Sequence, residues 1–194
     1  MEIIDISVPF FSCPVYPGDP LPRAEKTADY KKGDIYTLSN VSACVHTGTH
    51  IDAPLHFIEG GKSIEQLELN PFIGECLVWE ARGEIGPETV ERIPKCERLL
   101  IKGGGKAYFS PAGAKAAAGR GILLAGIDSL SVSREGEEAA VHTAFLGNNV
   151  FIAECLDLSK VNPGTYFLFA PPVKFDGLEG APARAVLLKN YLRF

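Results

Sequence analysis

The hydrophobic positions of this chain fall into short runs, and most of these runs have the length of a β-strand. Residues 74–81, 98–102 and 121–127 are apolar stretches rich in leucine or β-branched side chains, which is typical of buried strands. Similar short runs predict strands at 2–8, 149–156, 165–170 and 183–190. Alternation of polar and apolar residues predicts another strand at 34–46. The chain is therefore expected to be built mainly from short strands.

Helices are predicted to be few and short. The clearest one covers residues 111–118, where Ser110 can cap the helix, a proline takes the first helical position, alanines fill the interior and Gly119 stands at the end. A second helix is predicted over 141–146, ended by Gly147. Strands outnumber helices and alternate with them irregularly, so the expected fold class is α/β of the mixed α+β kind.

Three short segments carry turn or cap signals. The sequence VYPGDP at 15–20 predicts a turn, because proline pre-sets φ and glycine tolerates positive φ. Residues 63–66 have the Ser-to-Gln spacing of a capping box, which predicts a short helix. The run GGGK at 103–106 lacks the first glycine and the Ser/Thr of a phosphate-binding loop, so it also predicts a turn.

Composition narrows the class of protein. The 194 residues are 46% hydrophobic and 22% charged, which excludes a disordered chain and is consistent with one domain over residues 1–194. The net charge is −5 and no Lys/Arg cluster occurs, so no nucleic-acid partner is expected. The longest uninterrupted apolar run has five residues, Tyr166–Ala170, whereas a membrane-spanning helix needs about 20.

The five cysteines indicate a reducing environment. Their number is odd, they are scattered, and no C-x-x-C occurs, which argues against a disulfide framework or a zinc ribbon. The first residues carry acids where a secretory signal would carry bases. We therefore expect a cytoplasmic protein with no membrane segment.

Three of the four histidines lie in the run HTGTHIDAPLHF, residues 46–57. They are His46, His50 and His56, and Asp52 lies between them. Imidazole and carboxylate are the ligands that zinc and similar divalent ions use in proteins. A strand would project all four even-numbered side chains to one side. This cluster therefore predicts a metal site.

The run must bend for these side chains to share an ion. Ten extended residues span roughly 33 Å, which is too far for ligands at about 2 Å from a metal. Gly48 and Pro54 are the residues at which a bend can form. A helix over the same residues is rejected, because Thr-Gly-Thr and a nearby proline are poor helix formers.

Two more candidate ligands lie further along the chain. His142 is the remaining histidine, and Glu154 interrupts the apolar strand VFIAECL. A carboxylate in such a strand is either solvated or bound to a counter-charge, and its position alone leaves both readings open. If both residues join the cluster, five ligands with Asp52 as a shared carboxylate suit two metal ions.

The run HTGTHIDAPLHF resembles the signature of the cyclase / kynurenine formamidase family of metal-dependent hydrolases, H-x-G-T/A-H-x-D-x-P-x-H-F/Y. IIDISVPF, VYPGDP, GID at 126–128 and PPVKFDGLEGAPARAVLL are similar to other parts of that family. The resemblance implies a single swivelling β/β/α-type domain with a mixed, partly barrel-like sheet and few short helices. It also implies a homodimer or a higher homo-oligomer.

The resemblance assigns the metal ligands. His46, His50 and Asp52 would hold a first divalent ion, and Asp52, His142 and Glu154 would hold a second. Mixed nitrogen and oxygen ligands suit zinc and manganese alike.

The resemblance also implies roles for two residues beside the metals. His56 would be the catalytic acid/base, with an ordinary pKa near 6.5. Tyr16 stands where formamidases usually carry tryptophan and would line the pocket for a small-molecule amide substrate.

The expected activity is hydrolysis of an amide C–N bond, as in conversion of N-formylkynurenine to kynurenine and formate. One alternative keeps the same site but takes a cyclic amide of the isatin type. Another is a metal-binding protein without catalysis.

Overall fold

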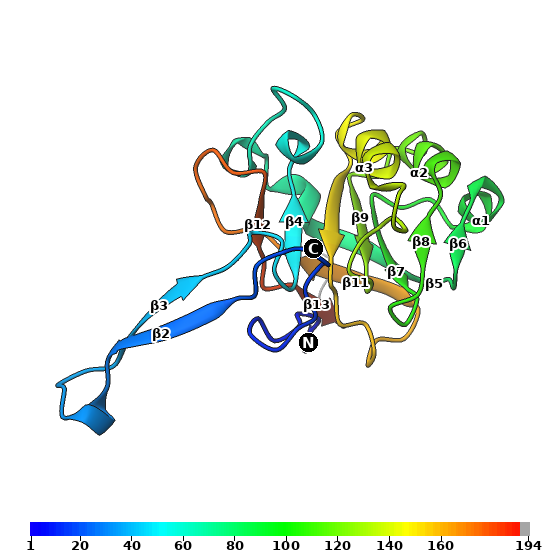
Figure 1. Ribbon diagram of the computed structural model, residues 1–194. Coiled ribbons are helices and arrows are strands. Elements are labelled where there is room, and N and C mark those ends of the chain that lie inside the picture. Colours follow the sequence, from blue (N-terminus) through cyan, green and yellow to red (C-terminus); the bar gives the residue numbers. More distant parts are fainter. Residues whose placement is uncertain (191–194) are drawn as a thin grey trace.

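The computed structural model describes residues 1–190 and is organised around a curled, nine-stranded mixed sheet that forms a half-barrel (Figure 1). Its strand order is β1-β13-β11-β5-β7-β9-β10-β4-β12. The four central strands run parallel to one another: β5 (Ile73–Glu80), β7 (Arg98–Lys102), β9 (Leu124–Ile127) and β10 (Phe151–Glu154). Parallel strands covered on both faces are expected to be continuously apolar, which explains the short hydrophobic runs in the sequence.

Antiparallel strands extend this sheet at both sides. Beyond β5 lie β11 (Gly164–Phe169), β13 (Val186–Lys189) and β1 (Glu2–Asp5). Beyond β10 lie β4 (His50–Asp52) and β12 (Gly180–Pro182). The pairing of β4 with β10 joins the histidine-rich run to the central strands.

The α-helices α1 (Pro87–Arg92), α2 (Pro111–Ala118) and α3 (Glu138–Leu146) lie together on one face of the sheet (Figure 1). Their buried side chains form one core cluster with residues of β7, β9 and β10. A second core cluster packs the other face of the sheet. A two-stranded parallel sheet, β6 (Glu84–Ile85) with β8 (Tyr108–Phe109), lies beside the helices. The short 3-10 helices are η1 (Tyr30–Lys32), η2 (Pro54–His56), η3 (Ile64–Gln66) and η4 (Asn70–Phe72).

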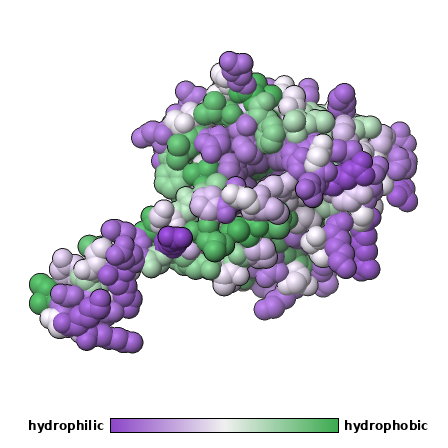
Figure 2. Space-filling model, in the orientation of Figure 1, coloured by the Kyte–Doolittle hydropathy of each residue, from purple (hydrophilic) through white to green (hydrophobic). Residues whose placement is uncertain are grey.

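A β-hairpin projects from this body as an arm, which we define as residues 23–42. It consists of β2 (Arg23–Ala28) and β3 (Leu38–Ser42), joined through η1. All the residues of β3 are exposed, and so are five of the six residues of β2. Figure 2 shows the arm standing off from the body, with hydrophobic residues among its hydrophilic ones.

Several sequence predictions are confirmed. The mixed α+β class with few helices is correct, and the helix at 111–118 and the strand at 98–102 have the predicted bounds. Ser110 Oγ accepts a hydrogen bond from the Gly113 N–H at 3.1 Å, as its capping role requires. The capping box at 63–66 is present at the start of η3. The single domain over 1–194 stays a prediction, and its last four residues lie outside the described ones.

Other sequence predictions are wrong in detail. The strand predicted at 34–46 is only β3, because the alternating pattern also covers a turn and the approach to the histidines; its partner at 23–28 was not predicted. The helix predicted at 141–146 begins at Glu138, because the preceding alanines are also good helix formers. Gly119 ends its helix at φ −63°, not in a left-handed conformation.

No helix within residues 1–190 combines the length and apolar character needed to cross a membrane.

We predict that Gly113→Ala destabilises the protein by about 2 kcal/mol, although alanine is the better helix former. A Cβ at Gly113 would lie 1.9 Å from the carbonyl oxygen of Ile85, so α2 and β6 would have to separate. Denaturant unfolding measures the change. Gly119→Ala is the matched control, because its Cβ would meet only ordinary contacts at 3.4–3.5 Å. A gain in stability for Gly113→Ala, as helix propensity alone would give, would contradict the close approach.

Candidate metal centre

The antiparallel register of β4 and β10 brings three candidate ligands to one face of the sheet. His50 lies directly opposite Glu154, and Asp52 lies opposite Ile152. Residues two apart on a strand share a face, so His50, Asp52 and Glu154 all point to the side on which Ile152 meets the helices. The site therefore lies at the end of β10, beside the helical layer.

Two histidines present the same ring atom to these carboxylates. His50 Nε2 lies 3.3 Å from Asp52 Oδ1 and 3.4 Å from Glu154 Oε2. His142, from the second turn of α3, places its Nε2 3.4 Å from Glu154 Oε1 and 3.7 Å from Asp52 Oδ2. Each Nδ1 donates to a backbone carbonyl at 2.8 Å, that of Gly48 or of Glu138. This arrangement fixes each ring and leaves Nε2 as a ligand atom, as in known metal sites.

His46 reaches the same carboxylate from outside the strand. Its Nδ1 lies 2.9 Å from Asp52 Oδ1, and its Nε2 lies 3.6 Å from Glu179 Oε1. The chain bends where the sequence predicted, since Gly48 has φ +66° and Pro54 begins η2.

A glycine on the neighbouring strand gives space to the His46 ring. A Cβ at Gly180 of β12 would lie 3.0 Å from His46 Cε1.

His56 lies next to the cluster on η2. Its ring stacks on that of His46, with centroids 4.1 Å apart, and meets the ring of His142 edge-on at 5.7 Å. The ring of Phe57 stacks on that of His142, with centroids 4.5 Å apart, and meets the ring of His56 edge-on at 4.4 Å. Burial lowers the pKa of His56, which favours the neutral imidazole at pH 7. A neutral ring in this position can accept a proton.

The buried polar atoms fit a divalent cation. Asp52 is 0% exposed and Glu154 is 5% exposed, and a buried carboxylate is costly without a counter-charge. His46 Nε2, His50 Nε2 and Asp52 Oδ2 are buried without a hydrogen-bond partner. Two groups of three ligand atoms lie within 4.8 Å of one another: those of His46, Asp52 and His56, and those of His50, Asp52 and Glu154. Asp52 belongs to both groups, whereas His142 belongs to neither.

The charges of the cluster are strongly coupled. Burial by itself would raise the pKa of Asp52, but the hydrogen bond from His46 and the adjacent His50 ring hold it well below its usual value. Burial would lower the pKa of His50, yet Asp52 and Glu154 raise it well above normal. Without a metal, the carboxylates are therefore balanced by protonated imidazoles, and a cation would take over that role.

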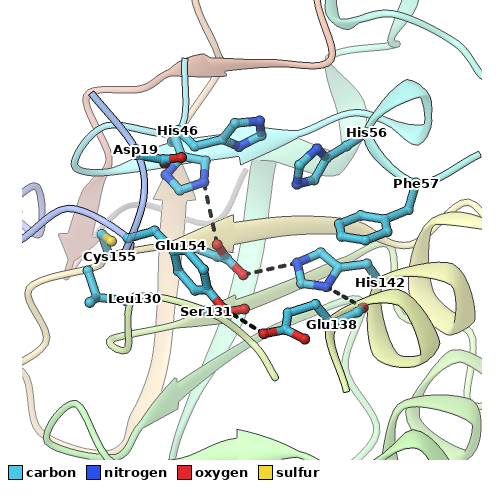
Figure 3. Close-up of a pocket in the computed structure, with 12 residues that line it drawn as sticks. Asp19, His46, His56, Phe57, Leu130, Ser131, Glu138, His142, Glu154 and Cys155 are labelled. Atoms are coloured by element: carbon cyan, nitrogen blue, oxygen red, sulfur yellow. Dashed lines mark hydrogen bonds and ion pairs between the residues drawn. The ribbon is translucent and has the colours of Figure 1, made fainter. Parts of the chain in front are cut away.

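A cavity of about 180 Å³ opens beside these side chains, and Figure 3 shows His46, His56, His142 and Glu154 pointing into it. Tyr16 also lines this cavity, and its hydroxyl donates to Glu138 Oε1 at 2.5 Å. The hydrogen bond to Glu138 raises the pKa of Tyr16 to about 12, so the phenol remains protonated.

Sequence reasoning did not find Glu138 or Glu179. Glu138 could have been found from its position four residues before His142, which puts both side chains on the same face of a helix. No feature of the sequence pointed to Glu179.

Residues 4–134 of the chain match a protein-family model, which is described as "Putative cyclase". The kynurenine formamidase of Erythrobacter litoralis is 33% identical over 188 residues, covering 90% of this chain and 87% of the relative. That of Delftia acidovorans is 31% identical over 192 residues, covering 90% of each.

Solved structures share the whole fold. A protein described as a potential metal-dependent hydrolase with cyclase activity superposes with a TM-score of 0.83 at 30% identity, over 96% of both chains. Isatin hydrolase A from Labrenzia aggregata has a TM-score of 0.83 at 21% identity, over 96% of this chain and 93% of its own. At that identity, the second likeness shows a common fold alone.

We predict that Mn²⁺ or Zn²⁺, added to chelator-treated protein at 100 times its dissociation constant, raises the Tm by about 5–10 °C. Asp52→Asn should remove most of this shift, because Asp52 is shared by both groups of ligand atoms. Differential scanning calorimetry with and without metal measures it. Asp176→Asn, at an exposed carboxylate, is the control and should keep the full shift. An equal shift in both variants would place the metal elsewhere.

Proposed function

The chain belongs to the cyclase family, and we propose that within it this protein is a metal-dependent hydrolase that cleaves the amide bond of an arylformamide such as N-formylkynurenine. The observation that carries this proposal is the convergence of His50, Glu154 and three further side chains on the buried Asp52, beside a cavity. The names of the relatives supply the choice of an aryl amide with a formyl group.

We assign the ligands in two sets that share one carboxylate. His46, His50 and Asp52 would hold one divalent ion, and Asp52, His142 and Glu154 would hold a second. The mixed nitrogen and oxygen ligands suit Zn²⁺ or Mn²⁺. When bound, such ions supply Lewis acidity, which lowers the pKa of water towards 7 and polarises the substrate carbonyl.

His56 is the residue we assign to proton transfer. Its lowered pKa leaves it neutral at pH 7, so it can take a proton from the attacking water. The protonated ring can then return that proton to the leaving nitrogen as the C–N bond breaks. The stack of its ring on His46 holds it at the edge of the cavity.

Tyr16 is the residue we assign to the aromatic part of the substrate. It lines the cavity, and its hydroxyl is fixed by Glu138. A ring held in this way offers a flat apolar surface on which an aryl group can stack.

Hydrolysis assays on N-formylkynurenine and isatin distinguish the two alternative functions from the proposed one. A cyclic amide such as isatin would use the same ligands and His56, so turnover of isatin and not of N-formylkynurenine would favour it. A metal-binding protein without catalysis would bind metal and hydrolyse neither. That reading has less support, because the relatives are named kynurenine formamidase, which is the name of an enzyme.

We expect His56→Ala to keep its metal and to lower kcat by about 10²–10⁴-fold, the usual contribution of a general acid/base. His50→Ala and Asp52→Ala should lose metal as well as activity. Metal analysis and rates on N-formylkynurenine distinguish these variants. Full activity in His56→Ala would remove this residue from the mechanism.

We further propose a homodimer, in which each arm (residues 23–42) packs on the second copy. An isolated two-stranded hairpin is at best marginally stable in water. The arm nevertheless exposes Ile35, Leu38 and Val41, with Ile35 86% exposed. Hydrophobic surface also lies on the body beside the base of the arm (Figure 2). We propose a cytoplasmic location, consistent with five free cysteines.

Light scattering should give the wild-type protein twice the chain mass of 20.9 kDa. The double variant Ile35→Asp/Val41→Asp should shift the protein towards one chain, because it places charges on the apolar surface of the arm. Lys32→Ala, on the same arm, is the control and should remain dimeric. A wild-type protein that is monomeric at micromolar concentration would contradict the proposed assembly.

A further inference from the structure

A second cavity, of about 430 Å³, adjoins the one beside the candidate metal ligands. We call the cavity beside the ligands the inner cavity and the larger one the outer cavity. Both are lined by Tyr16, Leu130, Ser131 and Glu138, so the two cavities meet at the Tyr16–Glu138 hydrogen bond. Figure 3 shows Glu138 and Ser131 on the side of the inner cavity away from His46 and His56.

The inner cavity is small for the substrate we propose. Its volume of about 180 Å³ is close to that of an engineered cavity of ~150 Å³ that binds one benzene ring. An arylformamide ring with its formyl group would fill this space. N-formylkynurenine also carries a ketone and an α-amino acid, and this end must lie outside the inner cavity.

The outer cavity has charges of both signs. Lys106 lines it, and none of the ion pairs within residues 1–190 involves this lysine. Glu135 and Glu138 line it as well, and Ser131 and Ser133 add hydroxyl groups. An amino-acid end has a carboxylate and an ammonium group, which are the charges that complement this lining.

The position of Lys106 is fixed by the loop that precedes it. The N–H groups of Gly103, Gly104 and Gly105 donate to the Asp128 carboxylate, at 2.9–3.2 Å. Asp128 directly follows β9 and is therefore anchored to the central sheet. Lys106 therefore follows a turn that is held by hydrogen bonds to Asp128, although its own side chain is exposed.

We propose that the outer cavity is the subsite for a zwitterionic amino-acid end of the substrate, with Lys106 pairing with its carboxylate and Glu135 and Glu138 facing its ammonium group. This inference rests on the proposed function and specifies its substrate as an arylformamide that carries an amino acid. A cyclic amide such as isatin has no such end and would leave the outer cavity unused.

The test compares two substrates that differ only in this end: N-formylkynurenine and 2′-formamidoacetophenone, which keeps the aryl ketone and lacks the amino acid. We expect Lys106→Ala to raise KM for N-formylkynurenine about three- to fivefold, with kcat within about twofold, since an ion pair at an exposed site is lost. KM for 2′-formamidoacetophenone should not change. Lys106→Arg should restore most of the loss, and Lys160→Ala, at another exposed lysine, should behave as wild type.

Binding of the products gives a second readout that does not depend on turnover. Calorimetry on metal-loaded protein should show that kynurenine binds more tightly than 2′-aminoacetophenone, and that Lys106→Ala removes this preference. Equal effects of Lys106→Ala on both compounds, or none on either, would overturn the subsite. If the wild type hydrolyses neither substrate, the proposed function fails. The binding preference then decides the subsite alone, and equal affinities for the two products would overturn it.

Discussion

The structure depends on the placement of one fully buried carboxylate, that of Asp52. Its oxygens lie 2.9–3.7 Å from ring nitrogens of His46, His50 and His142, and Oδ2 has no hydrogen-bond partner. A buried negative charge with an unpaired oxygen is stable only where positive charge is provided. Protonated imidazoles can provide it in part, and divalent cations provide it in the form that hydrolysis requires.

The fold supplies this placement through a few local features. The register of β4 and β10 puts His50 opposite Glu154, and α3 brings His142 over the end of β10. Gly180 on the neighbouring strand leaves room for the His46 ring. The candidate ligands therefore gather at the carboxyl end of the parallel strand β10, the end at which ligands bind in other open sheets that contain parallel strands.

The sequence was most informative where local chemistry decides the outcome. Ser110 and the alanines that follow it determine α2 without long-range help, and Gly48 and Pro54 mark the bends of the histidine run. It was least informative for contacts between segments far apart. The strand at 23–28 in the arm and the hydrogen bond between Tyr16 and Glu138 leave no local signal in the sequence. Each depends on a partner that only the fold brings close.

We propose that divalent cations bind on both sides of Asp52. Anomalous diffraction from crystals grown with Mn²⁺ or Zn²⁺, recorded at the metal absorption edge, tests this proposal most directly. We expect one peak between Asp52 and the pair His46 and His50, and a second between Asp52 and the pair His142 and Glu154. The absence of any peak at Asp52 would contradict the claim, and so would a single peak that leaves His142 and Glu154 without metal at saturating concentration.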